Sequence, residues 1–422
     1  MTSQPQVGRS AILARRARVL SPTYRLFYEQ PLQIVRAEGV WMYDEQGRAY
    51  LDAYNNVPVV GHCHPYVVEA LTRQARTLNT HTRYLAELPL QLAEELLATM
   101  PPELGNVVFT CTGSEANDLA VRVSKAVTGG TGFIITDFSY HGVTDVLSGM
   151  SPEDGGQLGP GVYTVPSPAA PSGAAAFGER VLESIERMRS DGVRLAALLA
   201  DTIFSSDGVF ADPKGFLAEA VRHVRSAGGL FIADEVQPGF GRLGEAMWGF
   251  QRHGIIPDLV TMGKPMGNGH PVAAVAGRPD IFARFAQGRH YFNTYGGNSV
   301  SCAAALAVLH VIRNENLLEN ARRTGEYLKR GLKALAGRYS VIGEVRGAGL
   351  FVGVELRANP ATGLTGPAET KRVVNGMCRR GVLVGSTGRH GDVLKIRSPL
   401  TLETRHADSL LEALEQTLKE KD

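Results

Sequence analysis

Cysteine is scarce in this sequence, and its arrangement excludes two classes of site. Four cysteines occur in 422 residues, widely scattered and without a CxxC pair, so neither a disulfide framework nor a zinc ribbon is indicated. One dense cluster, His62-Cys63-His64, does not predict a metal site, because adjacent side chains point in different directions and rarely converge on one ion. We therefore expect no metal and a reducing, cytoplasmic location.

Long apolar runs and an excess of charge of one sign are also missing. No segment approaches the roughly 20 apolar residues that a membrane-spanning helix needs, and the net charge is only +2. Neither a membrane nor nucleic acid is therefore an expected partner. Residues 1–20 are basic but contain no long apolar block and no small-residue cleavage site, which argues against a secretory signal. They favour an amphipathic arm that packs on the protein or on a partner subunit.

The chain is long enough, and with 44% hydrophobic residues apolar enough, to form two domains. Residues 33–52 alternate apolar and polar positions and predict a short β-meander, and residues 65–78 and 89–100 have helical periodicity. From about residue 106, compact apolar strands alternate with helices, which is typical of an α/β domain with a mostly parallel sheet. The strands expected there are 106–111, 132–137, 195–201, 229–235 and 258–264.

The remaining segments are a connection and the C-terminal elements. Residues 151–177 are rich in Pro, Gly, Ser and Ala and predict a long surface connection. Residues 298–336 predict a long helical region. Residues 341–422 mix strands with a final amphipathic helix.

Four unusual polar segments follow expected strands of the parallel sheet. They are Thr112-Gly113-Ser114-Glu115, Tyr140-His141-Gly142, Asp234-Glu235-Val236-Gln237 and Gly263-Lys264-Pro265. In an open parallel sheet, ligands bind at the carboxyl ends of the strands. We therefore expect these four segments to meet in one site.

Lys264 stands out among the nine lysines of the chain. Most of the others lie beside further charges in helical patterns, where a solvated face explains them. Lys264 follows an apolar strand and precedes a small, flexible segment, and a lysine in apolar surroundings can have the lowered pKa that a Schiff-base nucleophile needs. The alternative is a lysine that merely caps the end of a strand.

Asp234 ends a strongly apolar strand, where a carboxylate is costly to bury without a partner. A protonated pyridine nitrogen is such a partner, and the carboxylate would keep that ring protonated and electron-withdrawing. A metal-binding or ion-paired acid is the alternative. An Asp-Glu pair at a strand end also occurs in nucleotide hydrolases, but no GxxxxGK[ST] motif is present to support that function.

Two further segments suit a flat, phosphorylated ligand. Gly113 and Ser114 open a helix, so that free backbone N–H groups and the positive end of the helix dipole would face a phosphate. Ordinary capping by Thr112 or Ser114 is the alternative there. Tyr140 follows a strand and could stack on a flat ring, although a buried core tyrosine is equally common.

Taken together, these segments resemble the class III aminotransferase family of fold-type I pyridoxal-phosphate (PLP) enzymes. The similarity extends from about residue 35 to about residue 415. It is carried by GHCHP (61–65), GSEAND (113–118), YHG (140–142), DEVQPGFGR (234–242), PDLVTMGKPMGNGHP (257–271) and FNTYGGN (292–298).

The resemblance implies PLP as cofactor and assigns roles to individual residues. Lys264 would be the Schiff-base lysine and proton carrier, and Asp234 would pair with the pyridine nitrogen; these two are the expected catalytic residues. The implied cofactor-binding set is Gly113, Ser114, Tyr140, His141, Asp234, Gln237, Lys264 and Thr294. Within this set Tyr140 stacks on the ring, Gln237 lies near its phenolic oxygen, and Gly113 and Ser114 hold the phosphate.

The resemblance also implies an assembly and a domain organisation. Thr294 would reach the phosphate of the neighbouring subunit's cofactor, so we expect a homodimer, or a tetramer of two dimers, with active sites at the subunit interface. The implied fold is a large α/β domain with a smaller α+β domain built from both chain ends. The expected boundaries are 1–55 for the N-terminal arm and part of the small domain, 56–305 for the PLP domain and 306–422 for the C-terminal small domain.

The branch within the family is less clearly indicated. The stretches 55–65, 78–85 and 260–271 resemble phospho-lyases that act on O-phosphoethanolamine or phosphohydroxylysine, a branch that is also similar to alanine–glyoxylate aminotransferases. Two departures bear on the choice between these branches. Asp201-Thr202 stands where many aminotransferases have Glu-Pro, although a phosphate site would need more positive charge there than an aspartate gives. Arg397 stands at a position where the pattern of the phospho-lyases has a lysine. An arginine suits bidentate recognition of a carboxylate better than a lysine does.

We therefore expect an aminotransferase that moves an amino group from an amine or amino acid to a 2-oxo acid such as pyruvate or glyoxylate. The first alternative is a phospho-lyase acting on O-phosphoethanolamine or a related phosphorylated amine. The second alternative is a non-catalytic PLP-binding protein, and the intact site motifs argue against it. Arg397, Asp201 and Asn56 are the expected substrate-binding residues. A surface ion pair is the alternative role for Arg397. Arg389 is a further candidate for an anion contact. Ser205 and Ser206 are expected to lie beside Asp201 on the substrate side.

Overall fold

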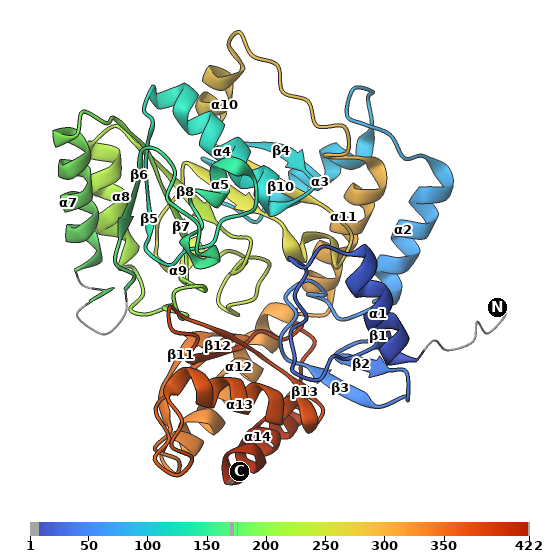
Figure 1. The fold of residues 1–422 in the computed structure, drawn as a ribbon. Coiled ribbons are helices and arrows are strands. Elements are labelled where there is room, and N and C mark those ends of the chain that lie inside the picture. Colours follow the sequence, from blue (N-terminus) through green and yellow to red (C-terminus); the bar gives the residue numbers. More distant parts are fainter. Residues whose placement is uncertain (1–7, 169–172, 175, 421–422) are drawn as a thin grey trace.

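The computed structural model describes residues 8–168, 173–174 and 176–420. Its centre is a seven-stranded sheet in the order β4-β10-β9-β8-β7-β5-β6 (Figure 1). All neighbouring strands are parallel except β10, which is antiparallel to both β4 and β9, so the predicted mostly parallel α/β sheet is confirmed. The strands are β4 (Asn106–Thr110), β5 (Gly132–Thr136), β6 (Val162–Val165), β7 (Leu195–Asp201), β8 (Leu230–Asp234), β9 (Leu259–Met262) and β10 (Ala273–Gly277).

Helices cover both faces of this sheet, because its central strands are apolar on both sides. Helices α4 and α10 pack on one face with the residues of one buried cluster, and α7 and α8 pack on the other with a second cluster. The helices of this part are α2 (Pro65–Thr77), α3 (Glu87–Leu97), α4 (Gly113–Thr128), α5 (Asp145–Ser148), α7 (Phe177–Ser190), α8 (Leu217–Ser226), α9 (Gly249–Arg252), α10 (Pro279–Ala286) and α11 (Ser299–Asn314), with short 3₁₀ turns η1 (Pro152–Asp154) and η2 (Lys264–Gly267).

The two ends of the chain meet in smaller sheets below the large one in Figure 1. The first has the order β1-β2-β3-β13 and the second β11-β12-β15-β14. Strand β3 near the N-terminus pairs in parallel with β13 near the C-terminus, which joins the two ends. The elements are α1 (Arg9–Val19), β1 (Ile34–Glu38), β2 (Trp41–Asp44), β3 (Ala49–Asp52), α12 (Leu317–Ala336), β11 (Ile342–Ala348), β12 (Phe351–Leu356), α13 (Gly366–Arg379), β13 (Val382–Leu383), β14 (Gly385–Thr387), β15 (Val393–Ile396) and α14 (Thr404–Lys419).

The structure corrects the sequence interpretation in two places. Residues 151–177 are not only a connection, because they contain β6, the edge strand that pairs with β5; residues 169–172 and 175 of this segment lie outside the described residues. The helical region 298–336 is two helices, because Asn316 adopts a left-handed conformation with φ of 52° that ends one helix before the next begins. The predicted β-meander is present as β1, β2 and β3.

Two further predictions concern the N-terminal arm and the lack of a membrane-spanning helix. Helix α1 forms part of the expected N-terminal arm and contains no fully buried residue in the single chain. Among the described residues, no helix is both long and apolar enough to cross a membrane.

Candidate active site

A small cavity lies at the carboxyl ends of β7, β8 and β9, where α4 begins. Its volume is about 110 Å³. Seven of the eight predicted cofactor-binding residues line it, together with the predicted substrate residue Asp201. The lining residues are Gly113, Ser114, Asn117, Tyr140, His141, Gly142, Asp201, Asp234, Val236, Gln237 and Lys264. The four polar segments thus meet in one site, as parallel strand ends require.

The carboxylate of Asp234 is held in one orientation at the inner end of this cavity. Its Oδ2 atom accepts hydrogen bonds from Nδ1 of His141 and Nδ2 of Asn117, both at 2.8 Å, and its Oδ1 atom accepts one from the backbone N–H of Val236 at 3.1 Å. Asn117 is itself fixed, because its Oδ1 atom accepts a hydrogen bond from Thr261 at 2.6 Å. A buried acid with this support can present negative charge to a ligand cation.

Lys264 follows β9 and begins the turn η2. Its backbone has a φ of +30°, an uncommon conformation for a residue with a side chain. Burial, together with the positive charge of the nearby Arg397, lowers the pKa of its amine to about 8, and Asp234 and Asp201 act in the opposite direction. A fraction of the amine is therefore neutral near neutral pH, as a nucleophile or proton carrier requires.

The beginning of α4 forms a narrow cradle beside Lys264. Thr112 is the N-cap, since its hydroxyl accepts a hydrogen bond from the backbone N–H of Glu115 at 3.1 Å, so the capping that the sequence allowed is present. A Cβ atom on Gly113 would lie 2.9 Å from Cγ2 of Val236, and one on Gly142 would lie 2.7 Å from Oγ of Ser114. These glycines leave room for an anionic group at the helix N-terminus.

The comparisons with known proteins agree with this geometry. The family model for class III aminotransferases matches residues 26–418. The chain belongs to the class III aminotransferase family. Its cofactor is therefore PLP, as in other members.

Similar proteins include members with two different named activities. The chain is 39% identical to an alanine–glyoxylate aminotransferase 2-like protein of Drosophila melanogaster, over 97% of this chain and 87% of the relative. It is 36% identical to ethanolamine-phosphate phospho-lyase homolog 1 of Caenorhabditis elegans, over 97% and 94% of the two chains. A solved structure of a phospholyase from Arthrobacter in complex with phosphoethanolamine has 41% identity and a TM-score of 0.91, covering 96% of this chain and 99% of that one.

The cavity fits PLP by the chemistry of its donors. The Asp234 carboxylate could hold a protonated ring nitrogen, and the amine of Lys264 could form the covalent link to the cofactor. The backbone of Gly113 and the hydroxyl of Ser114 lie where the helix dipole favours a phosphate. Tyr140 is half-buried in the cavity wall rather than packed in the core, which leaves its ring available for stacking.

Gln237, which lines the cavity, is hydrogen-bonded to Asn56 and to Arg397. Oε1 of Gln237 accepts a hydrogen bond from Nη1 of Arg397, and the backbone oxygen of Gln237 accepts one from Nδ2 of Asn56 at 3.0 Å. Arg397 is 6% exposed and also donates to the backbone oxygen of Tyr54 at 3.1 Å. Arg397 is thus a buried cation without a carboxylate partner within ion-pair distance among the described residues, and the surface ion pair that the sequence allowed is wrong.

Asp201 lies directly beside Asp234, because the two residues are paired in the register of β7 and β8. Its carboxylate accepts hydrogen bonds from the backbone N–H groups of Ile203 and Ser205, both at 3.0 Å. Burial raises its pKa. The neighbouring Ser206 donates a hydrogen bond to Oε2 of Glu153 at 2.6 Å, so this wall of the site carries several acids.

Sequence reasoning missed one charged residue near the site, Lys395 on β15. Its side chain is buried, with 6% exposure. Burial, together with the positive charge of Arg397, lowers its pKa to about 7. Its ammonium makes no hydrogen bond or ion pair with any residue that the structure describes. The alternation of a strand could have indicated it, since Lys395 and Arg397 are two positions apart and lie on the same side of the chain.

Two further predicted residues, Thr294 and Arg389, are not among those that line the cavity of the single chain. Thr294 is exposed in the loop between α10 and α11, so its contact with a partner's cofactor stays a prediction. Arg389 forms an ion pair with Oδ2 of Asp137 at 2.6 Å, and its guanidinium is therefore engaged away from the cavity. Asn117 lines the cavity without having been given a role from the sequence, whereas Gly142 and Val236 line it as members of the polar segments that were expected to meet there.

Proposed function

We propose that this enzyme is a PLP-dependent phospho-lyase that eliminates phosphate from O-phosphoethanolamine or a related phosphorylated amine. The observation that carries the proposal is the pair of buried cations Lys395 and Arg397 beside Lys264. A buried ammonium without a counter-ion is costly. A doubly charged phosphate group of the substrate would offset that cost and take part in charge-assisted hydrogen bonds with both side chains.

This cation pair changes the balance that the sequence alone suggested. A phosphate site needs more positive charge than Arg397 can supply next to Asp201, and Lys395 supplies it. The similarity to the Arthrobacter phospholyase, whose structure contains phosphoethanolamine, supports the same substrate class.

The proposed roles of the other residues follow from their positions. Bound PLP supplies an electron-withdrawing ring that weakens the bonds at the carbon carrying the amino group. Asp234 would keep the proton on the ring nitrogen, and Lys264 would take the proton from that carbon as a general base. The electron pair of the broken C–H bond would form a double bond to the neighbouring carbon, whose bond to the phosphate oxygen would break with its electron pair leaving on the phosphate held by Lys395 and Arg397.

Aminotransfer to a 2-oxo acid such as pyruvate or glyoxylate is the second candidate. Arg397 favours it, because a guanidinium can hold a substrate carboxylate in a bidentate pair. The relative named as an alanine–glyoxylate aminotransferase 2-like protein supports it as well. In this case Lys264 would deliver the proton to the carbon of the cofactor that is bonded to the nitrogen, and no phosphate would be released.

One experiment separates the two candidates. The purified yellow holoenzyme is mixed with O-phosphoethanolamine without a keto acid, and inorganic phosphate and the visible spectrum are followed together. Continuous phosphate release with a persistent yellow colour is the result expected of the phospho-lyase. Stoichiometric bleaching by an amino donor such as alanine, reversed by pyruvate or glyoxylate and without phosphate release from O-phosphoethanolamine, would instead identify the aminotransferase.

A further inference from the structure

The segment GHCHP (61–65) has no role in the site described above, although it is one of the stretches that carry the family resemblance. Its two histidines contact different carboxylates. Nε2 of His62 lies 2.7 Å from Oδ2 of Asp52, and Nε2 of His64 lies 3.0 Å from Oε1 of Glu315. The side chain of Asp52 is fully buried, whereas that of Glu315 is exposed. The contact of His62 is therefore the one of the two that reaches the interior of the protein.

Asp52 is an ionised carboxylate at the end of β3. Burial alone would raise its pKa, but hydrogen bonds from His62, Asn55 and Tyr54 outweigh burial and hold the pKa below its ordinary value. An ionised carboxylate can only accept hydrogen bonds, so Nε2 of His62 is the donor. The ring is held in place for this contact, because the backbone of His62 is paired with that of Gly39.

The same carboxylate holds the turn that follows β3. Its Oδ1 atom accepts hydrogen bonds from the backbone N–H groups of Tyr54 at 3.0 Å and Asn55 at 2.8 Å. Its Oδ2 atom accepts one from the side-chain amide of Asn55 at 3.1 Å in addition to that from His62. The conformation of residues 53–56 is therefore set by Asp52, and the orientation of Asp52 is set in part by His62.

This turn contacts Arg397. The backbone oxygens of Ala53 and Tyr54 accept hydrogen bonds from the backbone N–H and from Nε of Arg397, at 2.7 and 3.1 Å. The guanidinium also lies 5.1 Å from the centre of the Tyr54 ring. At the end of the turn, Nδ2 of Asn56 donates to the backbone oxygen of Gln237 at 3.0 Å. The turn therefore fixes the guanidinium of Arg397 beside Gln237, which lines the active-site cavity.

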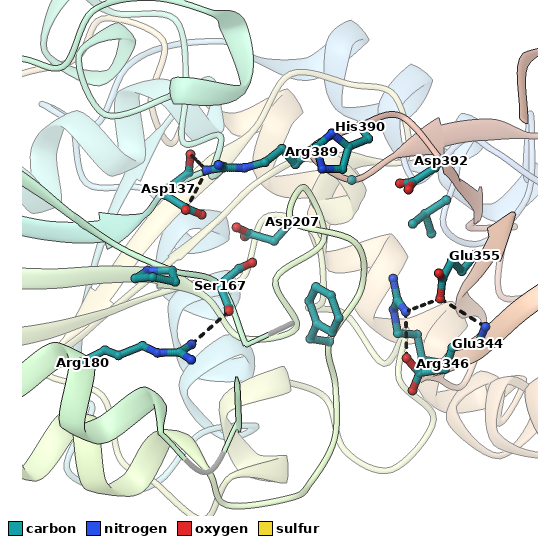
Figure 2. A pocket seen from close by; sticks show the side chains of 14 residues that line it. Asp137, Ser167, Arg180, Asp207, Glu344, Arg346, Glu355, Arg389, His390 and Asp392 are labelled. Atoms are coloured by element: carbon teal, nitrogen blue, oxygen red, sulfur yellow. Dashed lines mark hydrogen bonds and ion pairs between the residues drawn. The ribbon is translucent and has the colours of Figure 1, made fainter. Parts of the chain in front are cut away.

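Arg397 is the cation that an anionic substrate group has to reach in both candidate functions. Arg389, the other arginine considered for an anion contact, is held by Asp137 at 2.6 Å (Figure 2). Burial lowers the pKa of Arg397, and Asp52 is among the groups that act in the opposite direction. Asp52 therefore attracts the guanidinium, but the side chain that it contacts directly is His62. His62 in this way leaves the guanidinium of Arg397 available to the substrate.

We propose that His62 and Asp52 are positioning residues for the anion-binding part of the substrate site, and that they act through the turn after β3 and Arg397. Their role rests on that of Arg397, which binds a phosphate in one candidate function and a carboxylate in the other. Loss of the hydrogen bond from His62 loosens the turn. It also leaves Asp52 a buried charge with one partner fewer, which competes with the substrate anion for Arg397.

The test measures binding to the holoenzyme without turnover. Inorganic phosphate is titrated by calorimetry as a probe of the anion site, and ethylamine is titrated through the visible spectrum as a probe that lacks an anionic group. A hydrogen bond to a charged group corresponds to about 10–150-fold in an equilibrium constant, and only part of it is transmitted to Arg397, so His62→Leu should weaken phosphate binding about 5–20-fold. The affinity for ethylamine should stay unchanged.

Three further variants provide the controls. His62→Gln keeps an N–H donor close to the position of Nε2 and should restore most of the phosphate affinity. His64→Leu removes the contact of the neighbouring histidine with the exposed Glu315 and should change the affinity for neither probe, because exposed pairs contribute little. Arg397→Met should weaken phosphate binding at least as much as His62→Leu does.

Equal weakening of both probes by His62→Leu, or a failure of His62→Gln to restore phosphate binding, would overturn the proposal, because either result is that of a general loss of structure. Weak phosphate binding in Arg397→Met but not in His62→Leu would overturn it while leaving the proposed function intact. Unchanged phosphate binding in both variants would also remove the assigned role of Arg397. If His62→Leu does not fold, His62→Phe, which keeps a ring but lacks the donor, takes its place in the same comparison.

Discussion

Nδ1 of His141 lies 2.8 Å from Oδ2 of Asp234, and both side chains are buried. His141 follows Tyr140 in the loop after β5, whereas Asp234 ends β8, so the contact joins two of the segments that build the cavity. The other ring nitrogen of His141, Nε2, has no hydrogen-bond partner among the described residues. The orientation of His141 is therefore set by Asp234, and His141 in turn orients the carboxylate that would face the ring nitrogen of PLP.

We predict that His141→Leu lowers kcat without preventing folding. The substitution removes a hydrogen bond to a charged group, which contributes about 1.5–3 kcal/mol, and this corresponds to about 10–150-fold in rate. Steady-state kinetics and the visible spectrum of the holoenzyme check it. His406→Leu is the control, because His406 is a buried histidine in α14, remote from the cavity. Equal losses in the two variants would show that His141 acts only on stability.

The second prediction concerns the pH dependence of cofactor capture by Lys264. Since the pKa of this amine is lowered to about 8, its neutral, nucleophilic form increases as pH rises, makes up about half of the amine at pH 8 and is nearly complete about one unit higher. The rate at which apoenzyme and PLP form the yellow complex should rise about fivefold from pH 7 to pH 8, about twofold more by pH 9, and then level off. Stopped-flow absorbance from pH 7 to 10 measures it. A rate that keeps rising to pH 10 would mean that the amine has its ordinary pKa.

The third prediction tests the cradle at the start of α4. A Cβ atom on Gly113 would approach Cγ2 of Val236 to 2.9 Å, and overpacking of this kind costs about 1–3 kcal/mol. Gly113→Ala should therefore raise the dissociation constant of PLP by about 5–150-fold. The double variant Gly113→Ala/Val236→Ala should recover most of the affinity, because the obstructing methyl groups are gone. A failure of the rescue would show that Gly113 is needed for a reason other than this contact.

Much of this fold and site could be predicted from the sequence because the signals are local. Apolar strands and the polar segments after them identified the sheet and the residues Gly113, Asp234 and Lys264 that line one cavity. Strand β6 was missed, since its four residues are an edge strand within a Pro- and Gly-rich segment. Lys395 was missed although the alternation of its strand places it on the side of Arg397, because its burial depends on the packing of β12, β14 and β15.

The fourth prediction concerns the assembly. We propose a homodimer that brings Thr294 to the partner's cofactor. Large hydrophobic side chains near the loop of Thr294 are exposed in the single chain: Tyr295 is 69% exposed, and Phe292, 41% exposed, contacts His81 in the loop that also carries Tyr84 and Leu85. A partner subunit would bury them. Mass photometry should show a dimer, or a tetramer, for the native chain.

Charged substitutions in this surface should shift the chain toward monomers. Tyr295→Glu is the test variant, and Leu158→Glu, at a residue 45% exposed before β6, is the matched control. We also expect Tyr295→Glu to lower PLP affinity, because Thr294 is its neighbour. A monomeric native chain that binds PLP fully would contradict both the dimer and the assigned role of Thr294.

The last prediction concerns Lys395 and the nature of the substrate. If Lys395 and Arg397 hold a phosphate group, Lys395→Met should raise KM for O-phosphoethanolamine strongly, since a charge-assisted hydrogen bond of about 1.5–3 kcal/mol is lost. It should change the reaction with a simple amine that lacks phosphate very little. Lys329→Met is the matched control, because burial also lowers the pKa of Lys329. Lys329 lies on α12 and donates a hydrogen bond to the backbone oxygen of Gly347 on β11. A rise of KM that is equal for both substrates would show that Lys395 supports the cavity without contacting the phosphate.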